Sequence, residues 1–436
     1  MQIKPFKALR FDGGVVGDIG DCIAPPYDVI SDAQQEQLYE KSEHNIVRII
    51  RGKTAASDNG QDNQYTRAAG YLSKWIEQGA LRQDPEETIY GYVQDFDWAG
   101  AAIQRFSFIS LSKLEEFGGA VKPHEQILSK PLEDRLNLKR ATAADFGLVF
   151  MLYEDEQGIA DEVIERALVA EPLIDFVDDQ DVRHRVFEIT DAEDIERIVD
   201  MMSTRNCIIA DGHHRYTTGL TYAAESDNPQ AGYQMLAFAN TCHKGLIVLP
   251  THRLAGNLES FSFEKLLADL RENFELTKFG FDSSRAKADA RQQMLAEMEA
   301  KFANGSNAFG VYGADGAFYV AVLKNGSTMD SAMPEMSPAW RSLDVSVLHK
   351  LILEDLLGID KEKLARNENL QYVKGTPTAV DDSIAQVDAG HKQAAFFMNP
   401  VRMQQLVAVT DAGERMPQKS TYFYPKVYTG LTIHKL

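Results

Sequence analysis

Apolar positions recur along this chain at two different spacings, and these predict a mixture of helices and strands. In residues 62–78, Tyr65, Leu72 and Ile76 fall on one face at helical spacing, and Gly79 supplies a stop. Short apolar runs bounded by turn residues predict strands instead. Helices are expected near 32–41, 62–78, 160–168, 191–202, 263–272, 284–303 and 343–357. Strands are expected near 88–96, 103–111, 207–210, 233–238, 246–249, 394–398 and 421–427.

The turn that follows the apolar run 207–210 is the most informative local pattern. It reads Asp211-Gly212, and the helix behind it opens with His-His-Arg at 213–215. A glycine turn that leads into a helix leaves the first backbone N–H groups at the positive end of the helix dipole, where anions bind. Arg215 adds a forked donor that suits phosphate. The plainer interpretation is a strand–turn–helix with a solvated basic end, but the His-His-Arg run favours phosphate chemistry.

Two further segments carry groups that phosphate chemistry needs. His124 and Glu125 stand in a Lys-Pro-His-Glu-Gln run that is followed by four cations: Lys130, Arg135, Lys139 and Arg140. One carboxylate among cations is what a general base facing a phosphorylated substrate requires. Near the other end of the chain, an ammonium and two hydroxyls precede an aromatic strand at Lys419, Ser420 and Thr421. Taken singly, these segments also fit a helix N-terminus and a loop-to-strand junction.

These motifs carry a resemblance to a known family. Over its whole length the sequence resembles the prokaryotic family called domain of unknown function 1015, through Ala-Pro-Pro-Tyr-Asp-Val at 24–29, Pro-His-Glu at 123–125, and the segments 211–215 and 419–421. Three of these segments, in the same order, also resemble the much smaller ADP-dependent free-serine kinases, although the residues between them do not visibly match. The Asp-Gly-His-His-Arg turn resembles the fingerprint of the fold shared by ParB and sulfiredoxin.

The resemblance implies an α+β fold with a ParB/sulfiredoxin-like core and additional layers. It implies a phosphotransferase that acts on a hydroxyl, with free serine and O-phosphoserine as the pair, Glu125 as general base, and the 419–421 segment binding the substrate's phosphate or carboxylate. The donor stays open between ADP, ATP and pyrophosphate, and Asp211 is a candidate partner for Mg²⁺ or a nucleotide hydroxyl. The candidate residues are, for catalysis, His124, Glu125, Asp211 and His213; for phosphate or nucleotide, Gly212, His214, Arg215 and Thr241; and for substrate, Lys130, Arg135, Lys419, Ser420 and Thr421.

Composition and missing motifs narrow the classes of function. The net charge of −20 weighs against a nucleic-acid partner, because neutralising phosphates drives such binding. No apolar run approaches membrane-spanning length and the first residues lack a signal-peptide pattern, so a cytoplasmic protein without a membrane partner is expected. The sequence contains neither a P-loop nor a Gly-x-Ser-x-Gly elbow.

Metal and redox chemistry are also disfavoured. Adjacent helical residues point about 100° apart, so His213 and His214 do not easily serve one ion, and no protein-held metal is expected. Cys22, Cys207 and Cys242 are scattered, which suits reduced thiols. In sulfiredoxin-like proteins a cysteine precedes the His-Arg of the turn, and His213 stands there in this chain.

We expect four segments along the chain: an N-terminal α/β segment at 1–100, a phosphate-binding core at 101–255, an accessory insert at 256–340, and a C-terminal segment at 341–436 that completes the site. The three motifs are expected to line one cleft. Two alternatives to the kinase remain: a phosphoserine phosphatase or reverse phosphotransferase, and a ParB-like nucleotide-binding regulator without turnover.

Overall fold

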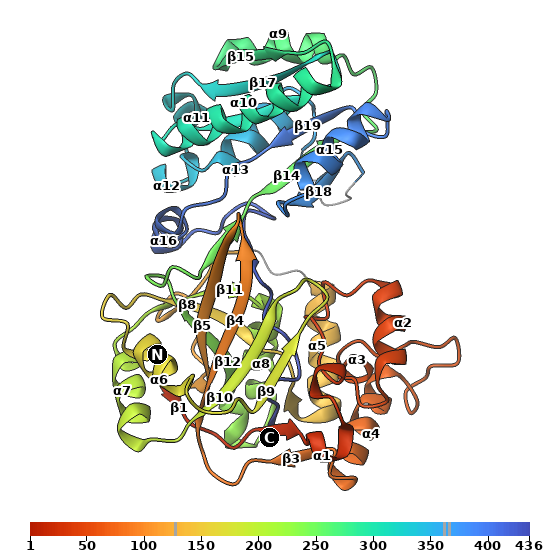
Figure 1. The fold of residues 1–436 in the computed structure, drawn as a ribbon, viewed down its shortest axis with the longest axis vertical. Coiled ribbons are helices and arrows are strands. Elements are labelled where there is room, and N and C mark those ends of the chain that lie inside the picture. The colour runs from red at the N-terminus through yellow and green to blue at the C-terminus, as the bar shows by residue number, and fades with distance from the viewer. Residues whose placement is uncertain (126–128, 361–362, 365–367) are drawn as a thin grey trace. The chain divides into compact units, whose positions relative to one another are not determined.

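The chain folds into two compact units. The computed structural model describes residues 1–125, 129–360, 363–364 and 368–436 (Figure 1). Unit 1 comprises residues 1–247 and 425–436, and unit 2 comprises residues 248–424. This division differs from the four expected segments, because the hairpin of β4 (Ile89–Trp98) and β5 (Ala101–Lys113) carries one sheet across residue 100. Residues on both sides of position 340 likewise belong to unit 2.

Unit 1 is built on a nine-stranded mixed sheet. Its strand order is β6-β11-β8-β12-β5-β4-β10-β9, with β1 beside β5. Besides β4 and β5 the strands are β1 (Ile3–Lys4), β6 (Val121–Pro123), β8 (Val149–Tyr153), β9 (Ile174–Val177), β10 (Arg183–Ile189), β11 (Cys207–Asp211) and β12 (Tyr233–Asn240). The pairs β6–β11 and β8–β12 are parallel, and the other neighbouring pairs are antiparallel. With its helices, this sheet confirms the predicted α+β class.

Helices cover the sheet of unit 1 by burying their apolar faces. Ile164 of α6 (Ile159–Ala167) and Ile198 of α7 (Ala192–Ser203) pack in one core cluster with Phe108 and Phe238 of the sheet. The Asp191 carboxylate caps the N-terminus of α7 by accepting two backbone N–H groups, and the helix begins where the sequence predicts. The remaining helices of unit 1 are α1 (Gly13–Val16), α2 (Asp32–Lys41), α3 (Val47–Ile50), α4 (Gln64–Glu77), α5 (Ser129–Thr142) and α8 (His213–Glu225).

The C-terminal residues 425–436 return to unit 1 and are held there by polar contacts. The Gln94 amide donates to the Lys426 carbonyl at 2.9 Å. His434 lies 3.3 Å from Asp145, which also forms a buried ion pair with Lys139 at 2.7 Å and accepts from Gln234 at 2.8 Å. These contacts tie the end of the chain to Gln94 and Asp145, which lie in its first third.

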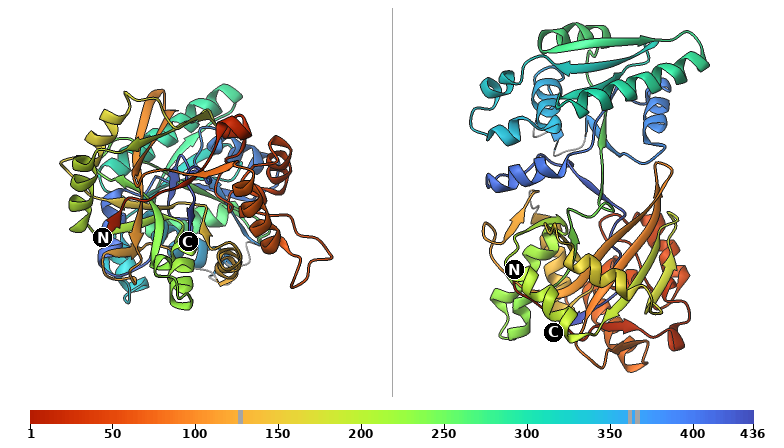
Figure 2. Two further views of the ribbon diagram at one scale, coloured as in Figure 1. Left: turned by 90° about the horizontal axis from the view of Figure 1, so that it is seen from below. Right: turned by 60° about the vertical axis from the view of Figure 1, so that its left-hand side comes forward.

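Unit 2 contains a six-stranded, wholly antiparallel sheet in the order β15-β17-β16-β19-β14-β18. The strands are β14 (Thr251–Ala255), β15 (Phe274–Gly280), β16 (Ala308–Tyr312), β17 (Ala317–Leu323), β18 (Leu370–Lys374) and β19 (Ala394–Phe397). Figure 2 shows α10 (Ser284–Ala303) along one face of this sheet, where Met294 and Met298 pack against Val320. The other helices are α9 (Phe263–Asn273), α11 (Ser327–Ala332), α12 (Pro338–Arg341), α13 (Asp344–Val347), α15 (Ala379–Asp388) and α16 (Met403–Asp411).

One predicted helix of unit 2 has an unexpected form. The sequence predicts a single helix over 343–357, and the structure instead has the short α13 followed by the π-helix η3 (Leu348–Glu354). Gly358, at φ 63°, ends the segment as predicted. Apolar spacing does not distinguish an α-turn from the wider π-turn, so the pattern could not reveal this. Among the described residues, no helix has the length and apolar character needed to span a membrane.

The buried Asp145 network predicts a pH-dependent contribution to stability. Burial alone would raise the pKa of Asp145, but Lys139 and His434 outweigh it and lower the pKa to about 2. The contribution is therefore complete above the ordinary pKa near 4 and is lost as the pH falls toward 2. We expect Asp145→Asn to lower the free energy of unfolding by at least about 2 kcal/mol at pH 7. Urea unfolding from pH 2 to 7 measures this difference, which should shrink below pH 4.

The control is Asp97→Asn, since Asp97 is exposed. This variant should match the wild type at every pH. If Asp145→Asn lowers the free energy of unfolding by the same amount at every pH, the charge of Asp145 does not have the stabilising role proposed for it.

Candidate functional site

Two parallel strands bring the first two sequence motifs to the same edge of the unit 1 sheet. β6 and β11 pair in parallel, with Ile209 opposite Pro123. His124 and Glu125 follow β6, and Asp211 ends β11, so all three lie where these strands end. The buried His124 ring donates from Nδ1 to the Ile209 carbonyl at 2.5 Å, which fixes its tautomer, and burial lowers its pKa. The strand pairing therefore places the candidate base beside the turn that begins α8.

His213 holds this arrangement together. Its Nε2 accepts the backbone N–H groups of His124 at 3.2 Å and of Glu125 at 3.3 Å. A nitrogen that accepts two N–H groups carries no proton, so the ring is neutral in this geometry. His213 thus positions the base-bearing segment against the first turn of α8, and its Nε2 is already engaged there. The catalytic role that the sequence predicts for His213 stays a prediction.

Gly212 is required at the turn for two physical reasons. Its φ of 93° lies in the left-handed region, and an added Cβ would lie 2.9 Å from Nε of Arg215. The absent side chain lets the guanidinium fold back over the turn. There Nη1 donates to the Leu148 carbonyl, and Nη2 lies 3.5 Å from Oδ1 of Asp211. Nε of Arg215 is buried and has no hydrogen-bond partner among the described residues.

Asp211 is held as a carboxylate by two cations. Lys426 Nζ lies 2.8 Å from its Oδ2, and Arg215 lies on its other oxygen. Burial alone would raise the pKa of Asp211, but the charges of Lys426 and Arg215 hold it well below its usual range. Lys426 is not among the residues predicted from the sequence, because a lysine after an aromatic strand carries no distinctive pattern.

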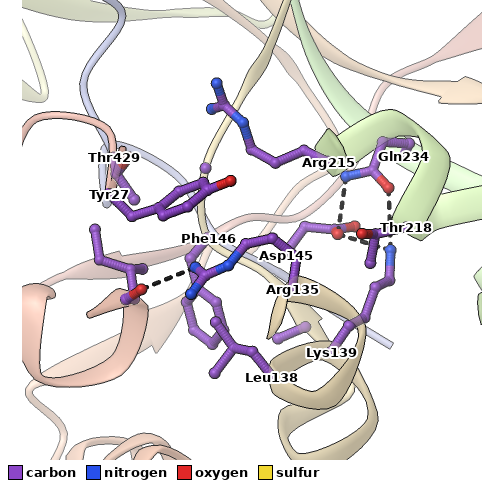
Figure 3. A pocket seen from close by; sticks show the side chains of 13 residues that line it. Tyr27, Arg135, Leu138, Lys139, Asp145, Phe146, Arg215, Thr218, Gln234 and Thr429 are labelled. Carbon is purple, nitrogen blue, oxygen red and sulfur yellow. Dashed lines mark hydrogen bonds and ion pairs between the residues drawn. The ribbon is translucent and has the colours of Figure 1, made fainter. Parts of the chain in front are cut away.

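The Arg215 pocket opens beside this cluster and has a volume of about 490 Å³, its mouth included (Figure 3). The side chains of Arg135 and Arg215 extend toward Tyr27 in this view, with the Arg135 guanidinium 3.9 Å above the Tyr27 ring. Oγ1 of Thr218 is buried there without a hydrogen-bond partner among the described residues. The remaining lining residues are Ile50, Leu138, Lys139, Ala144, Asp145, Phe146, Gly147, Gln234 and Thr429. Polar donors thus face a cavity that an anion can enter.

The N-terminal motif at 24–29 also reaches this site. Tyr27 lines the Arg215 pocket, and burial raises its pKa. Burial lowers the pKa of His214. The nearby carboxylates of Asp28 and Glu125 raise this pKa, but by less than burial lowers it. In the sequence this motif contributes only to the family resemblance, because nothing local in Pro-Pro-Tyr-Asp indicates a ligand.

Not every candidate residue joins the cluster. Thr241 follows β12, which runs antiparallel to β11, so it lies at the opposite edge of the sheet, where its N–H donates to Tyr153. Arg140 pairs with Glu225 at the surface. Lys130 begins α5, but its side chain lies outside the described residues. Lys419, Ser420 and Thr421 belong to unit 2, and their convergence with the unit 1 residues stays a prediction.

Two observations concern possible metal ligands and thiols in the described part of the chain. There, no group of three or more histidine, cysteine, aspartate or glutamate side chains is arranged to hold a metal ion. Burial raises the pKa of Cys22 to about 11 and of Cys207 to about 12, which suppresses their thiolates.

Comparison with known proteins places the chain in a family. The family model described as "Protein of unknown function (DUF1015)" matches residues 3–346. The chain belongs to this DUF1015 family. No curated protein matches it.

Several solved structures are similar to this DUF1015 protein at a low level. A free serine kinase variant in complex with AMP has 12% identity and a TM-score of 0.35, covering 72% of this chain and 87% of that one. A conserved hypothetical protein from Pyrococcus furiosus has 13% identity and a TM-score of 0.32, covering 73% and 92%. SbnI with a C-terminal truncation, from Staphylococcus aureus, has 10% identity and a TM-score of 0.35, covering 75% and 87%. Scores this low do not establish a common fold.

The Arg215 pocket predicts phosphate binding that depends on the guanidinium. Arg215→Ala should weaken binding of pyrophosphate by at least about tenfold, because charge-assisted hydrogen bonds are lost. Isothermal titration calorimetry measures the affinity. Arg140→Ala, which removes an exposed guanidinium of the same chemistry, should bind like the wild type. Equal affinities in all three proteins would assign Arg215 a purely structural part.

Proposed function

We propose that this protein is a small-molecule phosphotransferase that acts on a hydroxyl group. The finer proposal is transfer between a nucleotide phosphate donor and free serine, with O-phosphoserine as the product, as the motif resemblance implies. The observation that carries the proposal is the Arg215 pocket, where Nε of Arg215 and Oγ1 of Thr218 are buried without partners among the described residues. Buried donors of this kind are costly unless a ligand completes their hydrogen bonds.

In this proposal, the phosphates bind where α8 begins, with Arg215 and Arg135 contributing positive charge. The start of a helix favours anions, and two guanidinium groups counter the charge that spreads over a transferring phosphoryl group. Phosphoryl transfer depends mainly on positioning and electrostatics rather than on covalent chemistry by the protein. The His213 contacts to the 124–125 backbone support this, since they keep the base-bearing segment fixed relative to the phosphate site.

Glu125 is the proposed general base. Its side chain is 34% exposed, so a substrate hydroxyl can reach its carboxylate, and its backbone is fixed by His213. The carboxylate would take the proton of the serine hydroxyl as the oxygen attacks phosphorus. The bond between phosphorus and the donor's bridging oxygen then breaks, and the shortened nucleotide leaves with that electron pair.

Asp211 does not fit the part of a Mg²⁺ ligand in this geometry. Both of its oxygens face cations, with Lys426 at 2.8 Å and Arg215 at 3.5 Å, and a metal ion would have to displace them. We therefore assign Asp211 to holding Lys426 and Arg215 in place, and we route no step through a metal ion.

A phosphatase or reverse phosphotransferase is the second candidate, and the exposure of Glu125 favours it, because water can reach the same base. Product analysis separates the functions. The protein is incubated with free serine and ADP, ATP or pyrophosphate, and separately with O-phosphoserine. Phosphoserine with the shortened donor supports the kinase, and free phosphate from O-phosphoserine supports the phosphatase. Saturable nucleotide binding without turnover would support the third alternative, a nucleotide-binding regulator that is not an enzyme.

The base assignment predicts a loss of turnover without loss of binding. Glu125→Gln should retain nucleotide affinity but lose at least about a hundredfold in kcat, because a general base contributes on that order. Glu116→Gln is the control, since Glu116 is exposed and lies before β6, whereas Glu125 follows it. Steady-state kinetics and calorimetry together measure both quantities. Turnover near that of the wild type would remove Glu125 from the mechanism.

A further inference from the structure

The His124 ring lies beside the carboxylate of the proposed base. His124 follows β6 and is fully buried, whereas the Glu125 side chain is 34% exposed. Nε2 of His124 lies 4.0 Å from Oε1 of Glu125. The carboxylate is thus open to a substrate hydroxyl and also has an imidazole nitrogen close by.

The hydrogen bond on the other side of the ring decides what Nε2 can do. Nδ1 lies 2.5 Å from the Ile209 carbonyl oxygen, which can only accept, so Nδ1 carries the proton. Burial lowers the pKa of His124, and this outweighs the carboxylates of Glu125 and Asp211, which raise it. The ring is therefore neutral near pH 7, and its Nε2 carries a lone pair.

A neutral Nε2 and a carboxylate oxygen are both acceptors, so they cannot hydrogen-bond each other before the reaction. Their separation of 4.0 Å, longer than a hydrogen bond, fits two acceptors that face each other. Once Glu125 has taken a proton, its hydroxyl can donate to Nε2. The pair is therefore complementary to the protonated base, which the reaction forms, and not to the starting carboxylate.

We propose that His124 stabilises protonated Glu125 during phosphoryl transfer, by accepting a hydrogen bond from it at Nε2. The substrate O–H bond breaks as its oxygen bonds to phosphorus, and the proton goes to Glu125. The donor's bridging oxygen leaves with the electron pair of its P–O bond. The new hydrogen bond directs the proton away from the phosphate ester, and Glu125 then releases it to solvent through its exposed side. The inference rests on the proposed function.

His124 acts through Glu125, so it is a positioning residue, and its ring is held in place for this task. Nε2 of His213 accepts the backbone N–H groups of both residues, and the two imidazole rings meet edge to face with their centroids 4.8 Å apart. A simpler role for His124, fixing β6 to β11 through the Ile209 carbonyl, uses Nδ1 alone. Because the two roles use different ring nitrogens, variants can separate them.

A double-mutant cycle on the full chain tests the inference. Turnover is measured with serine and whichever of ADP, ATP and pyrophosphate yields phosphoserine with the wild type. His124→Asn keeps a donor for the Ile209 carbonyl but lacks Nε2. It should lower kcat about tenfold, the effect of one lost hydrogen bond, with KM and nucleotide affinity unchanged. In the Glu125→Gln background the same change should alter kcat by no more than about twofold, because a glutamine takes no proton.

The control is His391→Asn, since His391 is exposed in unit 2, and it should match the wild type. Losses that multiply in the double variant would assign His124 a purely structural part and overturn the inference.

A second variant covers the case in which His124→Asn no longer binds nucleotide. His124→Gln brings an amide oxygen that can accept in place of Nε2, so kcat should stay within about tenfold of the wild type. A loss as great as that of Glu125→Gln would overturn the inference. A wild type that forms no phosphoserine with any donor would instead refute the phosphotransferase proposal, and this inference with it.

Discussion

The contact of Asp211 with Lys426 and Arg215 is the interaction on which the candidate site depends. It joins the end of strand β11, the first turn of α8 and the returning C-terminal segment. The carboxylate balances two cations that would otherwise repel each other at close range. The Arg215 guanidinium is anchored by Asp211 and the Leu148 carbonyl, and its Nε is buried without a hydrogen-bond partner among the described residues. A mobile arginine side chain would lose conformational entropy when it binds an anion. An arginine that is already anchored in the folded protein avoids this cost on binding.

The polar groups around the Arg215 pocket are incompletely compensated. Arg135, Lys139 and Arg215 line it, and Asp145 is its one acidic lining residue among the described residues, which suits a phosphate. Buried polar groups are nearly always satisfied in folded proteins, so the unpaired Nε of Arg215 and Oγ1 of Thr218 are informative about the ligand of this pocket.

Much of the local structure could be predicted from the sequence. The apolar spacing predicts the helix α4, although its buried residues are Ala68, Leu72 and Trp75 and the predicted core residue Ile76 is exposed. The run 207–210 followed by Asp211-Gly212 matches β11 and the turn before α8. Such features depend on neighbours within a few residues, which the sequence displays directly. Helix type was less predictable, since the apolar spacing of 343–357 does not distinguish α13 from the π-helix that follows it.

What the sequence by itself determined is the chemistry available: the glycine turn, the His-His-Arg helix start, the Pro-His-Glu segment and the Lys-Ser-Thr segment. The tertiary structure decided which of these meet. Parallel pairing of β6 with β11 brings Glu125 to His213, whereas the antiparallel direction of β12 carries Thr241 to the other edge of the sheet. Lys426 and Tyr27 reach the site from opposite ends of the chain. The reason is physical: strand order and direction arise from contacts between residues far apart in sequence, and no local pattern encodes them.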